Sequence, residues 1–338
     1  MGKATIPEIL ADPFLEHATP LERGPLYLLG GRFDFQSNSE ALLRTVDAAY
    51  AGLPAHRLAA PLPRMRVGLH LTSREPRGRS EPAPLQMLAS GGYLGGATAS
   101  SNFVAINARD GSALVNVSAR MLRYPYHVRY ELLEFAVFTL ATRVQTLVPL
   151  HAACVGKRGR AVVLMGDSGA GKSTVSLQCL LQGLDFVSED STFVAPGSML
   201  CTGVANFLHV RSDTLRWVDR EAAAAIRRSP VISRRSGVRK FEVDLRRGDF
   251  RLAAAPLELA AVIFLSPRAA GQGALLQPLQ RDETLRRLAF FQSFAANQPG
   301  WGAFCKKVTR AGAFELRRGG HPREAVETLA AFLEHHRV

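Results

Sequence analysis

One segment of the sequence has the composition of a phosphate-binding loop. Residues 166–174 match the Walker A pattern G-x-x-x-x-G-K-[ST] in full, between an apolar strand expected at 161–165 and a helix. Glycines let successive N–H groups turn toward phosphate oxygens, and the helix adds its positive N-terminal dipole. A chance glycine-rich turn would not carry the complete pattern in this context. We therefore expect a nucleoside polyphosphate to bind at Gly166, Asp167, Ser168, Gly169, Ala170, Gly171, Lys172, Ser173 and Thr174.

Metal binding and proton transfer would fall to residues within and after this loop. Lys172 would reach the β- and γ-phosphates, and the Ser173 hydroxyl would be a ligand for Mg²⁺. Glu189 and Asp190 follow a strand expected at 185–187, and α/β sheets gather their ligands at the carboxyl ends of strands. One carboxylate can hold Mg²⁺ with Ser173, while the other takes the proton from an attacking hydroxyl. An acidic pair after a strand is otherwise more often a solvated turn, but the neighbouring loop favours catalysis.

A histidine and a basic run are weaker candidates. His151 lies on the strand before the loop strand, where a lone histidine is more often a packed core residue. The stretch 233–240 is dense in positive charge, and cations stabilise a transferring phosphoryl group. Arg239 and Lys240 are candidates for that contact, against the alternative of a solvated basic loop. Nucleic acid would also suit the run, but no helix-turn-helix, zinc or RNA-stacking pattern accompanies it, which argues against that partner.

These residues together resemble the HPr kinase/phosphorylase family. That family carries a histidine at the start of a strand hairpin, a G-D-S-G-x-G-K-S loop, and an acidic pair after the next strand. The counterparts here are His151, residues 166–173, and the pair Glu189 and Asp190, so the close match covers roughly 150–194. The remainder agrees only in outline, being nearest to divergent HPr-kinase-related proteins with a different N-terminal domain.

The resemblance implies a fold, an activity and a role for each site residue. The fold would be of the phosphoenolpyruvate carboxykinase-like type, and the activity would be ATP-dependent phosphorylation of a serine hydroxyl on a protein or peptide. Lys172 and the loop amides would hold the phosphates, while Ser173 and Asp190 would bind Mg²⁺. Glu189 would be the general base, and His151 would lie near the transferred phosphoryl group. A homo-oligomer is also implied.

The sequence departs from the family pattern at two places. The first acid is normally aspartate, and Glu189 adds a methylene that moves the base by roughly one bond length. The family's E-I-R-G signature, tied to reverse phosphorolysis, is represented by residues 209–212, which lack its glutamate and glycine. Arg211 remains there as a further candidate phosphate contact. The change argues against phosphorylase activity and against HPr as the acceptor; related enzymes in biosynthetic clusters phosphorylate precursor peptides or other acceptors.

Two other functions stay open at this point. One is a kinase for a small metabolite, which would form ADP without labelling any protein. The other is a nucleotide-sensing regulator that no longer transfers phosphate. Retention of Lys172, Ser173, Glu189 and Asp190 argues against the sensor, because binding alone does not need a base.

Length and composition indicate the number of domains and the general class of the protein. The 338 residues predict a smaller α+β domain at 1–147 and an α/β P-loop catalytic domain at 148–338. With 47% hydrophobic and 21% charged residues the chain is globular rather than disordered, and no apolar run approaches the ~18 residues of a membrane span. The net charge of +13 comes largely from scattered arginines and identifies no partner.

Targeting and redox signals point to a cytoplasmic protein. The segment 1–14 contains Glu8 and Asp12 and has no continuous apolar core, which argues against a secretory signal, and Ile6 argues against myristoylation. The four cysteines form no C-x-x-C pair, which favours free, buried thiols in a reducing compartment.

Periodicity places the remaining elements. In the first domain we expect strands at 26–29, 32–35, 66–72, 103–106 and 113–117, a helix after Ser39 and a long amphipathic helix at 126–147. In the second domain we expect strands at 149–155, 160–165, 185–187, 240–245, 258–265 and 313–317, with helices at about 174–182 and 322–335.

Overall fold

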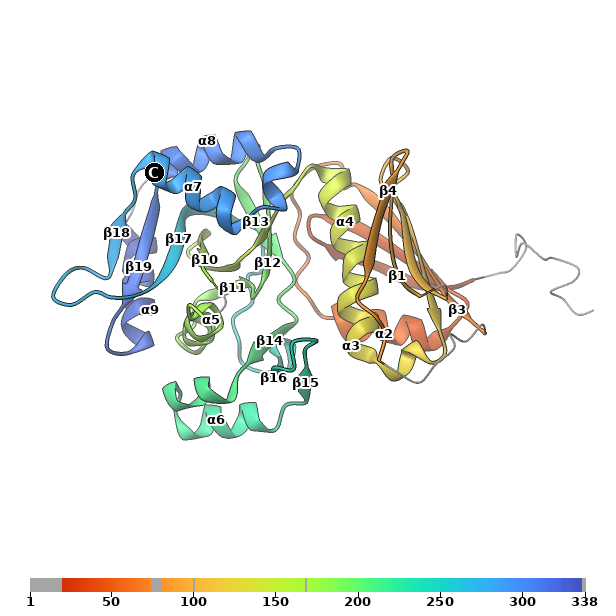
Figure 1. The fold of residues 1–338 in the computed structure, drawn as a ribbon, viewed down its shortest axis with the longest axis horizontal. Coiled ribbons are helices and arrows are strands. Elements are labelled where there is room, and N and C mark those ends of the chain that lie inside the picture. Colours follow the sequence, from red (N-terminus) through yellow and green to blue (C-terminus); the bar gives the residue numbers. More distant parts are fainter. Residues whose placement is uncertain (1–19, 74–80, 100, 168, 336–338) are drawn as a thin grey trace, which may run out of the picture.

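The computed structural model describes residues 20–73, 81–99, 101–167 and 169–335. The expectations about residues 1–14 and about Ser168 therefore lie outside the described residues. The described chain is a mixed α/β protein whose strands form three sheets (Figure 1). Within this part of the chain, no helix is both long and apolar enough to cross a membrane. All four cysteines are free and buried, as expected.

The N-terminal sheet has seven strands in the order β1-β2-β3-β7-β6-β5-β4. Side chains alternate between buried and exposed along β3 and β7, so one face packs and the other meets solvent. Helices α2 (Glu40–Tyr50) and α4 (Glu134–Gln145) cover the packed face in one continuous apolar core. The strands are β1 (Leu21–Leu28), β2 (Gly31–Ser37), β3 (Arg64–Thr72), β4 (Gln86–Ser90), β5 (Tyr93–Ala99), β6 (Asn102–Asn107) and β7 (Ser112–Ser118); α2 is Glu40–Tyr50.

The long helix predicted at 126–147 is interrupted by a change of helix type. It consists of α3 (Pro125–His127), a π-helical segment (Val128–Leu133) and α4 (Glu134–Gln145). Such π segments are rare in proteins, and those that occur often lie at functional sites. Figure 1 shows α4 between the N-terminal sheet and the C-terminal part of the molecule. Because Phe138 of α4 contacts Phe193 of the C-terminal sheet, with ring centroids 5.1 Å apart, this helix joins the two halves.

The C-terminal sheet curls so that β11, at one end of its path, contacts β12 and β13 near the other end. Its path runs β11-β9-β10-β17-β13-β12-β8, and β19 and β18 extend it beside β17. The single strand expected at 149–155 is two strands, β8 at one end of the path and β9 near the other, separated only by Ala152. Gly203 is required at the closure, since a Cβ there would lie 2.6 Å from the Ser188 Cβ. The strands are β8 (Val148–His151), β9 (Ala153–Lys157), β10 (Arg160–Met165), β11 (Asp185–Ser188), β12 (Ser191–Ala195), β13 (Leu200–Gly203), β17 (Leu257–Ala269), β18 (Leu276–Pro278) and β19 (Ala313–Arg318).

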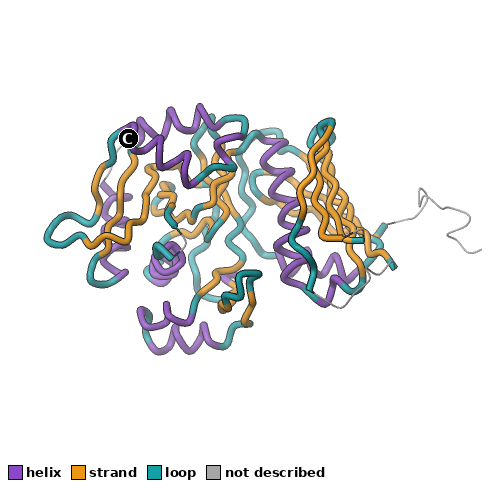
Figure 2. Tube along the Cα trace, viewed as in Figure 1, coloured by secondary structure: helices purple, strands orange, loops and turns teal. Residues whose placement is uncertain are grey.

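Helices cover both faces of this sheet (Figure 2). Val162 and Leu164 of β10 belong to one apolar core with α5 and α9, whereas Val163 and Met165 belong to another with α7 and α8. Burial on both faces explains why β10 is a continuous apolar run rather than an alternating one. These helices are α5 (Lys172–Leu181), α7 (Arg281–Phe291), α8 (Trp301–Ala311) and α9 (Pro322–His335).

A small third sheet lies beside the start of α5. Its order is β14-β16-β15, and α6 packs against it. The sheet matters for the site because His209 lies on β14, while Lys240 and Glu242 lie on β16. Its elements are β14 (Phe207–Val210), α6 (Arg220–Arg227), β15 (Val231–Ser233) and β16 (Arg239–Asp244).

Candidate functional site

The predicted loop connects β10 to α5 with glycines in left-handed conformations. Gly169 has φ +86° and Gly171 has φ +105°, values that side-chain-bearing residues rarely adopt. A Cβ on either would meet nothing within 4 Å, so backbone angle rather than lack of space requires glycine here. The Lys172 ammonium group, at the first position of α5, donates to the Gly166 carbonyl over 2.7 Å. The loop thus opens toward free space at a helix N-terminus, as anion binding requires.

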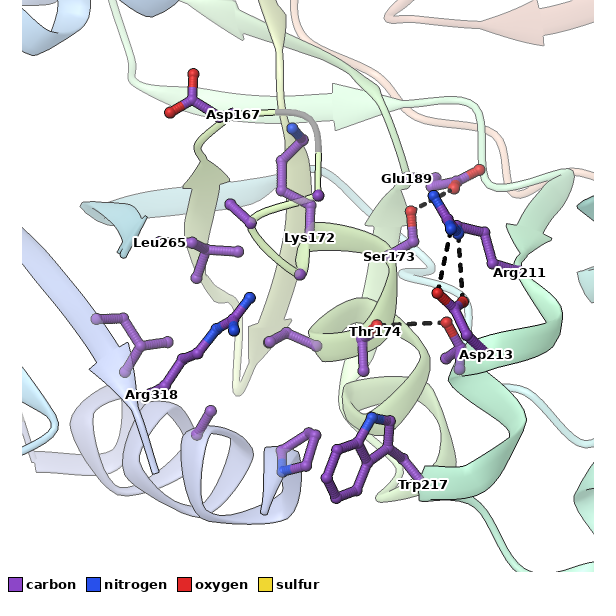
Figure 3. A pocket seen from close by; sticks show the side chains of 18 of the residues that line it. Asp167, Lys172, Ser173, Thr174, Glu189, Arg211, Asp213, Trp217, Leu265 and Arg318 are labelled. Atoms are coloured by element: carbon purple, nitrogen blue, oxygen red, sulfur yellow. Dashed lines mark hydrogen bonds and ion pairs between the residues drawn. The ribbon is translucent and has the colours of Figure 1, made fainter. Parts of the chain in front are cut away.

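A cavity of about 610 Å³ lies over this loop and is called the loop cavity below. This volume suits a nucleotide-sized ligand. Figure 3 shows Lys172 near its centre and Glu189 beside Arg211, with Arg318 reaching in from the side opposite Arg211. The structure brings most of the predicted site residues to its lining: His151, Asp167, Gly169, Ala170, Gly171, Lys172, Ser173, Thr174, Glu189, Asp190, Arg211 and Lys240.

The strand order explains why loop and acids meet. β9 lies between β10 and β11 and is antiparallel to both, so β10 and β11 run in the same direction. Their carboxyl ends therefore share one edge of the sheet, although the two strands are not neighbours as in a purely parallel sheet. The Ser173 hydroxyl donates to Glu189 Oε1 over 3.1 Å.

Glu189 is buried and held as a carboxylate. Its Oε2 accepts from the His209 backbone N–H over 3.0 Å and lies 2.7 Å from His209 Nδ1. Burial alone would raise the pKa of Glu189, but the hydrogen bonds and charge of His209, with the charge of Lys240, hold it below its usual range. Both oxygens are occupied and the ionised form is favoured, which suits a metal ligand better than a proton acceptor.

Asp190 faces the cavity instead. Its Oδ1 lies 3.2 Å from His151 Nδ1, and its Oδ2 lies 4.0 Å from the Arg234 guanidinium. The Asp190 side chain is 36% exposed and that of His151 is 65% exposed. His151 is therefore a surface histidine paired with an acid, not a packed core residue. Gln292 fixes its backbone from both sides, accepting from the His151 N–H over 2.8 Å and donating to its carbonyl over 3.1 Å.

A buried network behind Glu189 was not found from the sequence. Tyr130 and Arg129, on the π-helical segment, both donate to Glu242 Oε1, over 2.8 Å for the tyrosine. The Tyr130 hydroxyl also lies 3.0 Å from His209 Nε2. Burial alone would lower the pKa of His209, but its bonds to Glu189 and Glu242 raise it. The network therefore joins the N-terminal half to Ser173 through charged groups, and no local sequence pattern marks it because its members come from separate elements.

The basic run 233–240 contributes two cations, one of them unexpected. Lys240 lines the cavity, and burial together with the charges of Arg234 and Arg211 lowers its pKa. Arg239 lies outside the lining, because neighbouring strand residues point to opposite faces. Arg234, in the turn before β16, takes its place beside Asp190, and its buried Nε has no hydrogen-bond partner. A bound anion would offset the mutual repulsion of these neighbouring cations.

The far wall of the loop cavity holds residues that the sequence did not suggest. Trp217, at the end of a 3-10 helix (Ser212–Trp217), contacts the His321 ring with centroids 5.1 Å apart. Arg318 ends β19, whereas the predicted Arg211 lies on the opposite side of the cavity and is paired with Asp213 over 3.2 Å. An aromatic pair beside cations offers a surface on which a nucleobase can stack. No local sequence pattern distinguished Trp217, Arg318 and His321, since they are brought together from segments about 100 residues apart.

The donor set beside the loop fits one hard metal ion. No group of three or more His, Cys, Asp or Glu side chains could hold a metal by itself in the described part of the chain. Mg²⁺ bound with a nucleotide needs only one or two protein ligands, because phosphates and water supply the rest. The Ser173 hydroxyl and the Glu189 carboxylate, 3.1 Å apart, are such oxygen donors.

A comparison with protein-family models gives no match for this chain, and a comparison with curated proteins gives none either. The geometry of the cavity therefore carries the functional argument.

Proposed function

We propose that this protein is an ATP-dependent kinase that transfers the γ-phosphate to a serine or similar hydroxyl of a protein or peptide. Its C-terminal part, from Val148, would be a P-loop domain of the HPr kinase/phosphoenolpyruvate carboxykinase-like type. The observation that carries the proposal is the loop cavity itself, which gathers the Walker A loop, a serine–carboxylate pair and an exposed acid. A pure nucleotide sensor has no use for the exposed acid.

In this proposal the two acids have the opposite roles to those that the resemblance implies. Glu189, with its bond to Ser173, would hold Mg²⁺, and the metal would draw charge from the phosphates. Asp190 would be the general base, because its side chain is exposed to the cavity and its closest partners are His151 and Arg234. This assignment follows from which carboxylate has room for an acceptor hydroxyl.

The transfer step balances with these groups. The acceptor oxygen forms a bond to the γ-phosphorus while the bond from that phosphorus to the β–γ bridging oxygen breaks, and ADP leaves. Asp190 takes the hydroxyl proton, and the His151 contact orients its carboxylate. Lys172, Arg234 and Lys240 would face the phosphates and stabilise the negative charge that spreads over the transferring group.

The proposal is tested by transfer of label from γ-labelled ATP into proteins and peptides of the host lysate. We expect a labelled species that disappears with Lys172→Ala and with Asp190→Asn, and that persists with Arg239→Ala. No labelled species, with Mg-ATP binding intact, would overturn the proposal. Substrate-dependent ADP formation with candidate metabolites would then favour a small-molecule kinase.

A further inference from the structure

A second cavity of about 730 Å³ opens on the other side of the His151–Asp190 pair. It lies between the N-terminal sheet, helix α4 and the segment that follows α7. His151 and Asp190 line both this cavity and the loop cavity, so the two spaces meet at the proposed base. A molecule in the second cavity would present its end to Asp190.

The lining of the second cavity is mostly apolar and comes from both halves of the chain. Met87 is 57% exposed and Phe294 is 64% exposed. Large apolar side chains exposed together often mark a binding site. The apolar lining residues are Leu85, Met87, Leu94, Phe135, Phe138, Pro149, Leu150, Phe193, Phe291 and Phe294. This composition fits bulky aliphatic or aromatic groups of a ligand.

The wall formed by β4 favours an extended chain as that ligand. Within the described residues β4 is the last strand of its sheet, and all five of its residues are exposed. An edge strand offers unpaired backbone N–H and C=O groups to a further strand. Met87 lines the cavity and its neighbour Leu88 does not, because successive side chains of a strand point to opposite faces.

One polar group in the lining is available to a ligand. Glu134, on the first turn of α4, lines the cavity, and no hydrogen bond or ion pair holds it within the described part of the chain. The other acid of this helix face, Glu131, is already paired with Arg235 and His127. An oxygen of Glu134 can therefore accept a hydrogen bond from a backbone amide of the occupant.

We propose that the second cavity binds the phosphoryl acceptor as an extended peptide whose serine lies next to a large apolar residue. This inference rests on the proposed kinase function. The serine would reach Asp190 at the junction of the cavities, the neighbouring apolar side chain would lie among Met87, Phe135 and Phe294, and the peptide backbone would run along β4.

Two matched pairs of exposed residues test the site. Met87→Lys and Phe294→Asp alter the lining, whereas Leu88→Lys and Phe290→Asp place the same changes on neighbours outside it, 67% and 72% exposed. The probes are short synthetic peptides with one serine flanked by Phe or Leu, or by Asp or Lys. We expect wild type to prefer the apolar flanks. The lining variants should lose about 10-fold or more in kcat/KM for such peptides, a factor typical of one lost apolar anchor.

The possible results distinguish a failure of the acceptor site from a failure of the proposed kinase function. Equal use of all flanks, or equal loss in the lining and control variants, would overturn the acceptor site while leaving the kinase intact. If no peptide is labelled, binding of a fluorescein-labelled apolar serine peptide decides the question. Binding weakened by Met87→Lys and Phe294→Asp alone supports the site, and no binding overturns it. Mg-ATP affinity, measured alongside, should be unchanged in all four variants.

Discussion

The hydroxyl of Ser173 donates to the carboxylate of Glu189 over 3.1 Å, across a separation of 16 residues. The second oxygen of that carboxylate faces His209, whose raised pKa makes it a proton donor. This arrangement fixes Glu189 as an ion beside the hydroxyl that we propose as a magnesium ligand. The neighbouring acid, Asp190, is exposed to the cavity. The two carboxylates therefore differ in their access to a ligand.

The first prediction separates the two acids. Asp190→Asn should lower kcat by ~100-fold to ~10,000-fold, the usual effect of losing a general base, with Mg-ATP affinity little changed. Glu189→Gln should instead raise the Mg²⁺ concentration needed for half-maximal nucleotide binding. Isothermal titration and single-turnover labelling measure both effects. If Glu189→Gln alone abolished turnover at saturating Mg²⁺, the roles would be those implied by the family resemblance.

The second prediction concerns the loop lysine. Lys172→Ala should weaken ATP binding by at least ~10-fold, because a charged bond to the phosphates is lost. Arg239→Ala provides the control, since Arg239 lies outside the loop cavity and should bind ATP as wild type does. Equal losses in both variants would mean that overall charge, not the loop, holds the nucleotide.

The third prediction concerns nucleobase recognition. Trp217→Ala should weaken ATP binding by roughly 10-fold, in line with the loss of one stacking contact. Inorganic tripolyphosphate carries no base, so its affinity should not change. Competition against a fluorescent nucleotide measures both ligands. A parallel loss for tripolyphosphate would show that Trp217 only supports the loop.

The fourth prediction concerns the buried network between the two halves. Arg129→Ala would leave Glu242 in the interior without its guanidinium partner, and bonds to His209, Arg129 and Tyr130 now hold the Glu242 pKa at about 2 despite burial. Breaking such a pair should lower the free energy of unfolding by about 3 kcal/mol. Denaturant unfolding measures the loss. Arg44→Ala, which removes an exposed ion pair with Glu40, should cost little, and equal costs would contradict the network's role.

The fifth prediction is a pH dependence that comes from Glu134. Burial raises the pKa of Glu134 to about 8 from an ordinary 4.5; Arg129 and His209 oppose the rise, and Asp190 and Glu242 add to it. Between these values the folded chain keeps a proton that the unfolded chain releases, so stability falls as pH rises.

Glu134→Gln does not titrate and should remove this part of the decline. Its melting temperature, compared with that of wild type from pH 5 to pH 8, should gain most at the alkaline end. The raised pKa of His209 also makes stability decline, from about pH 6.5 upward, but both proteins share it. Parallel curves for the two proteins would contradict the assignment.

The sequence by itself determined the loop and the elements around it. A complete Walker A pattern between an apolar run and a helix is a local property, because each glycine and the lysine act through their own backbone position. The same holds for the alternation of β3 and for the continuous apolar run of β10, whose burial patterns agree with expectation. The sequence predicts one strand at 149–155, and this is wrong because no residue type at Ala152 signals the break between β8 and β9.

Tertiary structure alone decided the partners of the site. Which acid is buried depends on His209 of β14, and the choice of Arg234 over Arg239 depends on a turn and on strand direction. Arg129 and Glu242 meet only because α4 packs the N-terminal sheet against the C-terminal half. Such contacts join residues distant in sequence, and their cost in chain entropy is offset by burial of the whole core rather than by any local preference.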